Sequence, residues 1–197
     1  MSSKKKSKGK AYKKKSTMKS LLKPTATQLL HQVQEYPIIQ CLVLENWCES
    51  GLTHVIVTRQ QPDGQFIFGN FLVDLLCLGV KDCFIKANAT QSMYDSHLRI
   101  VAKELDRLIE CPPDLAHAII YGGVDYARSL GFEPHSDYER CRLVLQPRDS
   151  FDTLPDVEFG IKGKPRYING PYDDVKFVLD TLTRNVGEDN FDHILRI

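Results

Sequence analysis

Residues 38–69, IIQCLVLENWCESGLTHVIVTRQQPDGQFIFG, decide the fold of this chain. Runs rich in β-branched and aromatic residues lie within this stretch at residues 38–44, 53–59 and 65–69. Between the second and third runs, Pro62-Asp63-Gly64 is typical of a tight turn, because proline pre-sets φ and glycine accepts a positive φ. The stretch therefore predicts a three-stranded antiparallel meander. The apolar run Leu72–Cys77 either extends the last strand or begins a helix.

Helical periodicity surrounds the predicted meander. Apolar residues recur at spacings of three and four in the middle of the chain, which places them on one face of a helix. Proline, glycine and capping residues set the boundaries of the expected helices, which are residues 25–36, 91–110, 114–130 and 136–146, and a last helix that Asp173 or Asp174 caps and Gly187 ends. A second hairpin is expected from Val157–Ile161 and Arg166–Asn169. The sequence therefore predicts an α+β fold, with an antiparallel three-stranded meander, a second hairpin and about five helices.

The charges of the chain are divided unequally. Residues 1–23 contain ten lysines, and the first acidic residue is Glu35. The rest of the chain contains the other 16 of the 26 basic residues and all 25 acidic residues. With almost no apolar residues, the first segment cannot bury enough surface to offset the entropy of ordering. We therefore expect a disordered lysine-rich arm at residues 1–23 and a single globular, acidic body at residues 24–197.

The lysine arm is the predicted nucleic-acid contact. Lysines neutralise phosphates and release condensed counterions, with little preference for base sequence. The predicted contacts are Lys4, Lys5, Lys6, Lys8, Lys10, Lys13, Lys14, Lys15, Lys19 and Lys23. RNA and DNA both fit this chemistry, as does an anionic membrane surface. Two alternatives stay open: a nuclear import signal in the clusters Lys4–Lys6 and Lys13–Lys15, and a tail that only improves solubility.

The expected helix at 114–130 carries the candidate catalytic residues. His117, Tyr121, Asp125 and Arg128 share one helix face, beside the glycine pair at 122 and 123. These side chains suit acid–base work or the binding of an anion, which gives the alternative function of a small hydrolase. The favoured interpretation is that an amphipathic helix turns its only polar face to solvent.

Cysteine and histidine spacing gives little support for a metal site. The six cysteines lack a C-x-x-C pair and most lie within apolar runs, as buried reduced thiols do. The set Cys111, His117, His135 and Cys141 does not match the ligand spacing of structural zinc sites. Asn169–Asp174 contains two carboxylates, but a turn followed by a helix N-cap explains them better. No metal and no cofactor are expected.

Targeting signals and nucleotide-binding motifs are missing from the sequence. No uncharged apolar run approaches the roughly 20 residues that cross a bilayer, and no secretory signal is present. We therefore expect a cytoplasmic protein without a membrane span. The sequence also lacks a P-loop, a dinucleotide fingerprint and the common hydrolase motifs.

Three segments carry a resemblance to a known family: Leu72–Asp82, Asp125–His135 and Gly170–Asp174. Together they resemble a bacterial family of conserved proteins without an established activity. The resemblance covers the chain from about residue 40 onward, supports a bacterial cytosolic origin and supplies no catalytic residue. A looser, fold-level similarity relates residues 25–110 to double-stranded-RNA-binding domains, which follow the order helix, three strands, helix. This segment departs from that family because the helix at 91–110 begins without a lysine cluster.

Two classes of function follow from these observations. The first is a non-enzymatic nucleic-acid- or ribosome-associated protein, held by its lysine arm while the acidic body contacts a protein partner. The second is a small enzyme, a hydrolase, centred on His117–Arg128. The arm favours the first, because it is a positive feature of the sequence.

Overall fold

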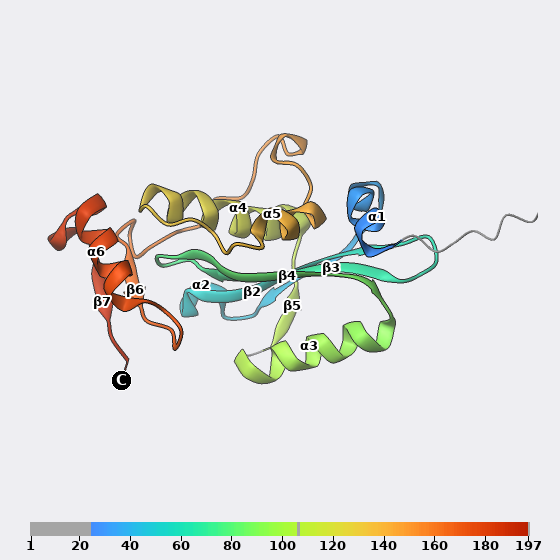
Figure 1. Ribbon diagram of the computed structural model, residues 1–197, viewed down its shortest axis with the longest axis horizontal. Helices are drawn as coiled ribbons and strands as arrows, with labels where there is room; N and C mark the ends of the chain where they lie inside the picture. Colours follow the sequence, from blue (N-terminus) through green and yellow to red (C-terminus); the bar gives the residue numbers. More distant parts are fainter. Residues whose placement is uncertain (1–24, 106, 197) are drawn as a thin grey trace, which may run out of the picture.

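A five-stranded antiparallel sheet forms the centre of the protein. The computed structural model describes residues 25–105 and 107–196. The strand order is β4-β3-β2-β1-β5, so four consecutive strands form a meander and β5 joins it beside β1 (Figure 1). The strands are β1 (Ile38–Leu44), β2 (Leu52–Gln60), β3 (Phe66–Asp74), β4 (Gly79–Ala89) and β5 (Leu108–Glu110). The α+β prediction is confirmed, and each predicted strand of the meander is present.

Helices cover both faces of this sheet. The helices of the described residues are α1 (Ala26–His31), α2 (Trp47–Ser50), α3 (Gln91–Leu105), α4 (Pro113–Ser129), α5 (Tyr138–Cys141) and α6 (Val175–Val186). Helices α1, α4 and α5 lie on one face and α3 lies on the other (Figure 1). Because side chains alternate along a strand, Val55 and Val57 of β2 pack toward α4, and Ile56 between them packs toward α3. Both faces of the sheet are therefore buried.

A smaller C-terminal unit lies at one end of the sheet. It consists of α6 and a two-stranded parallel sheet of β6 (Arg166–Ile168) and β7 (Asp192–Ile194) (Figure 1). Its apolar core joins the C-terminal end of α4 through Ala127 and Leu130. No helix in the described ranges is long and apolar enough to cross a bilayer.

Several helix boundaries follow the local signals in the sequence. Thr25 caps α1, and the side chain of Gln28 closes the reciprocal capping box. Asp174 accepts a hydrogen bond from the backbone N–H of Phe177 and so caps α6. Gly131, just after α4, has a φ of 94°, a left-handed conformation that glycine adopts without strain.

The predicted meander was too short, and the helix at 91–110 was too long. Residues 79–89 form β4, which the sequence analysis did not assign. Helix α3 ends at Leu105, and Leu108 belongs to β5, where it pairs with Leu44. The edge of β1 thus gains a hydrogen-bonded partner, which outweighs the helical periodicity of Leu108. Strands β4 and β5 also depart from the order of a double-stranded-RNA-binding domain.

The second hairpin and the helix at 136–146 were wrong. Strand β6 pairs in parallel with β7, and residues 157–165 form a loop with one isolated bridge between Ile161 and Lys164. The helix at 136–146 is divided into α5 and a short 3-10 helix at Arg142–Val144, and the side chain of its N-cap residue makes no capping bond. The predicted helix at 25–36 likewise ends at His31 and is followed by a 3-10 turn at Val33–Glu35.

Candidate functional site

His117 of α4 is completely buried and binds the backbone on both sides of its ring. Its Nε2 accepts a hydrogen bond from the backbone N–H of Gln146 at 2.9 Å, and its Nδ1 lies 2.5 Å from the carbonyl oxygen of Pro113. Nδ1 therefore carries the proton and the ring is neutral. Burial lowers the pKa of His117, against the opposing effect of the Pro113 carbonyl. Protonation at Nε2 would turn the bond to Gln146 into a contact between two donors.

Tyr121 and Asp125 hold the same segment, residues 146–151. The hydroxyl of Tyr121 donates to the carbonyl oxygen of Gln146 at 2.6 Å. The guanidinium of Arg148 lies 4.6 Å from the centre of the Tyr121 ring and binds both carboxylate oxygens of Asp125. This face of α4 is therefore a clamp for residues 146–151, and we call it the α4 clamp.

Arg128, the fourth predicted residue, lies outside the α4 clamp. Its guanidinium pairs with Glu133 at 2.9 Å, and both side chains are largely exposed. The interpretation of a solvent-facing stripe is wrong for His117 and Tyr121, which are 0% and 8% exposed. None of the four lines either of the two cavities described for this chain. The proposed catalytic role of these residues stays a hypothesis.

The glycine pair of α4 serves close packing. A Cβ atom on Gly122 would lie 2.5 Å from the ring of Phe159, and one on Gly123 would lie 2.9 Å from Val73. Conversely, a Cβ on Gly79 of β4 would lie 2.4 Å from the carbonyl oxygen of Gly123. The backbones of α4 and β4 thus approach each other closely, which explains why the helix tolerates two glycines.

Within the part of the chain that the structure describes, the thiols and histidines do not converge on a metal site. In the ranges that the structure describes, no group of three or more His, Cys, Asp or Glu residues is arranged to hold a metal ion. All six cysteines are free, and each is buried except Cys48. Burial raises the pKa of Cys41 to about 12, with a smaller contribution from the neighbouring thiol of Cys111. Burial also raises the pKa of Cys111 to about 11, with a smaller contribution from Asp114 and Glu110. Such thiols are protonated and weakly nucleophilic.

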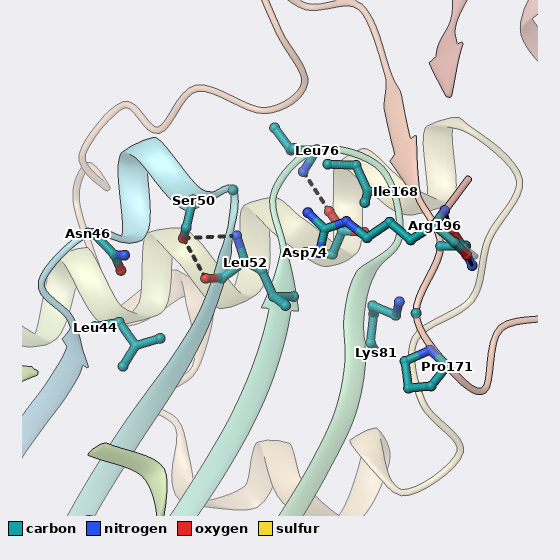
Figure 2. A pocket seen from close by; sticks show the side chains of 13 residues that line it. Leu44, Asn46, Ser50, Leu52, Asp74, Leu76, Lys81, Ile168, Pro171 and Arg196 are labelled. Atoms are coloured by element: carbon teal, nitrogen blue, oxygen red, sulfur yellow. Dashed lines mark hydrogen bonds between the residues drawn. The ribbon is translucent and has the colours of Figure 1, made fainter. Parts of the chain in front are cut away.

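A cavity of about 560 Å³ lies where the main sheet meets the C-terminal unit (Figure 2). Segments from distant parts of the chain line it: the end of β1, the region around α2, the turn between β3 and β4, the loop after β6, and Arg196. Its apolar lining is aliphatic and comes from Leu44, Leu52, Leu76, Ile168 and Pro171. We call it the junction cavity.

Two charged side chains from the main sheet line the junction cavity. Lys81 of β4 pairs with Asp173 at 2.8 Å, and both side chains are mostly buried. Burial alone would raise the pKa of Asp173, but hydrogen bonds from Lys81, Gly170 and Tyr167 outweigh it and lower that pKa. Asp74 accepts hydrogen bonds from the backbone N–H groups of the β3–β4 turn, yet burial raises its pKa.

Arg196 supplies the third charge. The side chain of Asn169 fixes its backbone through two hydrogen bonds, accepting from the N–H of Arg196 at 2.5 Å and donating to its carbonyl oxygen at 3.2 Å. Figure 2 shows the long Arg196 side chain extending toward the β3–β4 turn that carries Asp74 and Leu76. No carboxylate in the described residues forms an ion pair with its guanidinium.

Sequence reasoning did not identify the junction cavity. Its polar residues are far apart in sequence: 88 residues separate Lys81 from Asn169, and 27 separate Asn169 from Arg196. Periodicity and spacing therefore give no signal for them. The turn at Asn169–Asp174 contains the two carboxylates noted in the sequence. In the structure Asp173 binds Lys81, and Asp174 caps α6. The ten lysines of the arm lie outside the described residues.

Comparisons with known proteins add no relative. No protein-family model, no curated protein and no solved structure matches this chain. The resemblance to a conserved bacterial family therefore stays a prediction. Function must be inferred from the charges and contacts of the chain itself.

Proposed function

We propose that this chain is a non-enzymatic protein that binds RNA or DNA through its lysine arm, residues 1–23. The observation that carries the proposal is the presence of ten lysines and no acidic residue in those 23 residues. Lysine ammonium groups neutralise phosphates as point charges, so binding is strong at low salt and tolerant of sequence. Association with the ribosome, where RNA is abundant and exposed, is consistent with this chemistry.

The ion pairs of the body support placing the polyanion contact in the arm. Among the basic side chains that the structure describes beyond the arm, eight pair with carboxylates. They are Lys81, Arg107, Arg128, Arg142, Arg148, Lys164, Arg166 and Lys176. With an excess of acidic residues as well, the body repels phosphate more than it attracts it. The acidic body is then suited to contact a protein partner.

The contacts of α4 weigh against the alternative of a hydrolase. A general base needs a free lone pair or carboxylate within reach of a substrate. Both ring nitrogens of His117 are bound to backbone groups, and both carboxylate oxygens of Asp125 are bound to Arg148. To act on a substrate, these groups would first have to give up their hydrogen bonds within the fold.

Two matched triple variants test the proposal. Replacing Lys13, Lys14 and Lys15 by glutamine removes three positive charges from the arm, and replacing Lys86, Arg99 and Arg140 removes three from exposed positions on the body. We expect the arm variant to lose about 10- to 100-fold in affinity for a mixed-sequence 20-nucleotide RNA, measured by fluorescence anisotropy. The body variant should change affinity less than about threefold. Equal losses would show that the body binds the RNA.

A further inference from the structure

The junction cavity has the dimensions and lining of a small-molecule site. Its volume of about 560 Å³ lies within the range of ligand pockets, roughly 300–1,000 Å³. The apolar lining is aliphatic, and no aromatic side chain contributes to it. A flat nucleobase therefore finds no stacking partner in this cavity, whereas a hydrocarbon chain finds leucine and isoleucine surfaces.

The cations of the cavity differ in what they offer to a ligand. Lys81 is bound to Asp173, which itself receives hydrogen bonds from Gly170 and Tyr167. That pair joins β4 to the C-terminal unit, so its charge is already compensated. Arg196, by contrast, has a backbone fixed by Asn169 and forms no ion pair with a carboxylate of the described residues. Its side chain extends toward Asp74, whose carboxylate already accepts hydrogen bonds from the backbone of the β3–β4 turn (Figure 2).

We propose that the junction cavity binds a small aliphatic carboxylate. The guanidinium of Arg196 pairs with the carboxylate in the bidentate geometry that arginine favours. The hydrocarbon chain lies against Leu44, Leu52 and Ile168. Asn169 acts as a positioning residue, because it holds the backbone of Arg196 and not the ligand. This site is independent of the lysine arm and goes beyond nucleic-acid binding.

The chemistry of the cavity predicts how affinity varies with the ligand. Each additional methylene that enters the cavity should strengthen binding about fourfold, until the chain fills it. An uncharged alcohol of equal length keeps the apolar contacts and loses the ion pair. The acid should therefore bind about tenfold more tightly than the alcohol.

The experiment uses the full-length protein and measures binding of octanoate and 1-octanol by isothermal titration calorimetry. The single tryptophan, Trp47, lies in α2 beside the cavity residues Asn46 and Ser50, and its fluorescence gives a second readout. Wild type should bind octanoate about tenfold more tightly than 1-octanol. Arg196→Gln should remove that difference, and the matched variant Arg99→Gln, on the exposed face of α3, should keep it.

Three results would overturn the proposal. The first is that octanoate does not bind to the wild-type protein at millimolar concentration. The second is that octanoate and 1-octanol bind equally well, because the guanidinium then contributes nothing. The third is that Arg196→Gln, with an unchanged melting temperature, keeps the preference for octanoate. None of these results depends on RNA binding, so the junction site and the proposed function of the arm fail separately.

Discussion

The first 23 residues and the body that follows them use charge in opposite ways. In the first segment, ten lysines occur without a single acidic residue nearby in sequence. In the body, many charged side chains are held by partners: Arg148 binds Asp125, and Lys81 binds Asp173. A charge that is already compensated within the fold has little left to offer a ligand, and an uncompensated charge is available to one. We therefore propose that the arm, and not the body, binds the polyanion.

Buried polar groups in the body show most clearly how charge is compensated within the fold. Arg59 is 3% exposed, and its guanidinium donates to the carbonyl oxygens of Val144 and Tyr36. Two residues after Val144, the backbone N–H of Gln146 donates a hydrogen bond to His117. The polar residues on β2 and α4 thus fix the chain between α5 and the C-terminal unit. Substitutions at these positions should act on folding and leave RNA affinity unchanged.

The largest effect on stability should come from His117→Ala. The substitution leaves a cavity beside Phe151 and an unpaired N–H at Gln146. We expect the free energy of unfolding to fall by about 3 kcal/mol in urea titrations. RNA affinity should be unchanged at a temperature where the variant is folded. A loss below about 0.5 kcal/mol would contradict the burial of this ring.

Acidification should destabilise the body. Burial lowers the folded-state pKa of His117, so the unfolded chain takes up the proton first. The corresponding stabilisation is complete above the ordinary histidine pKa of about 6.5 and is lost as the pH falls through the folded-state value. Urea unfolding at pH 7.5 and pH 5.5 measures the loss.

The matched variant for this pH experiment is His117→Gln. Its stability should decrease less between the two pH values than that of the wild type. Part of the decrease should persist, because burial also lowers the pKa of His97. An identical decrease in both proteins would mean that His117 is not the group that titrates.

Asp125→Asn should have a smaller effect. The carboxylate and its partner Arg148 are each about half exposed, at 55% and 48%. Solvent screening limits such a pair, so the free energy of unfolding should fall by less than about 1 kcal/mol. Thermal unfolding monitored by circular dichroism provides the measurement. If α4 were an active site, this variant would keep its stability and lose the biological activity of the protein.

The smallest effect on stability should follow deletion of residues 1–23. The segment contains too few apolar residues to contribute to a core. We expect the free energy of unfolding to change by less than about 0.5 kcal/mol, measured in urea at pH 7.5. A larger loss would mean that the arm packs on the body, and the comparison between the two regions would fail.

Local signals in the sequence were sufficient for much of the fold. Runs of β-branched and aromatic residues, together with turn residues, identified the first three strands. Proline and glycine identified the boundaries of α4, and a capping aspartate identified the start of α6. The failures occurred where pairing partners are distant in sequence. Strand β6 pairs with β7, about 26 residues later, and β5 returns to β1 from the far side of α3. No local pattern in Leu108–Glu110 specifies that return.

The candidate sites show the same limit. Helical spacing grouped His117, Tyr121 and Asp125 on one face, and all three indeed contact one segment. Spacing did not reveal that the contacted segment belongs to the protein itself. The junction cavity was beyond sequence reasoning, because its lining is assembled from several loops and strand ends.

The salt dependence of RNA binding tests the central claim most directly. If about six lysines of the arm contact phosphate, a plot of log affinity against log salt concentration should have a slope of about −4. Affinity should then fall by about two orders of magnitude between 50 and 200 mM salt. The protein without residues 1–23 should bind the same RNA only weakly, with a slope near zero. A truncated protein that keeps the affinity and the slope of the full chain would contradict the account.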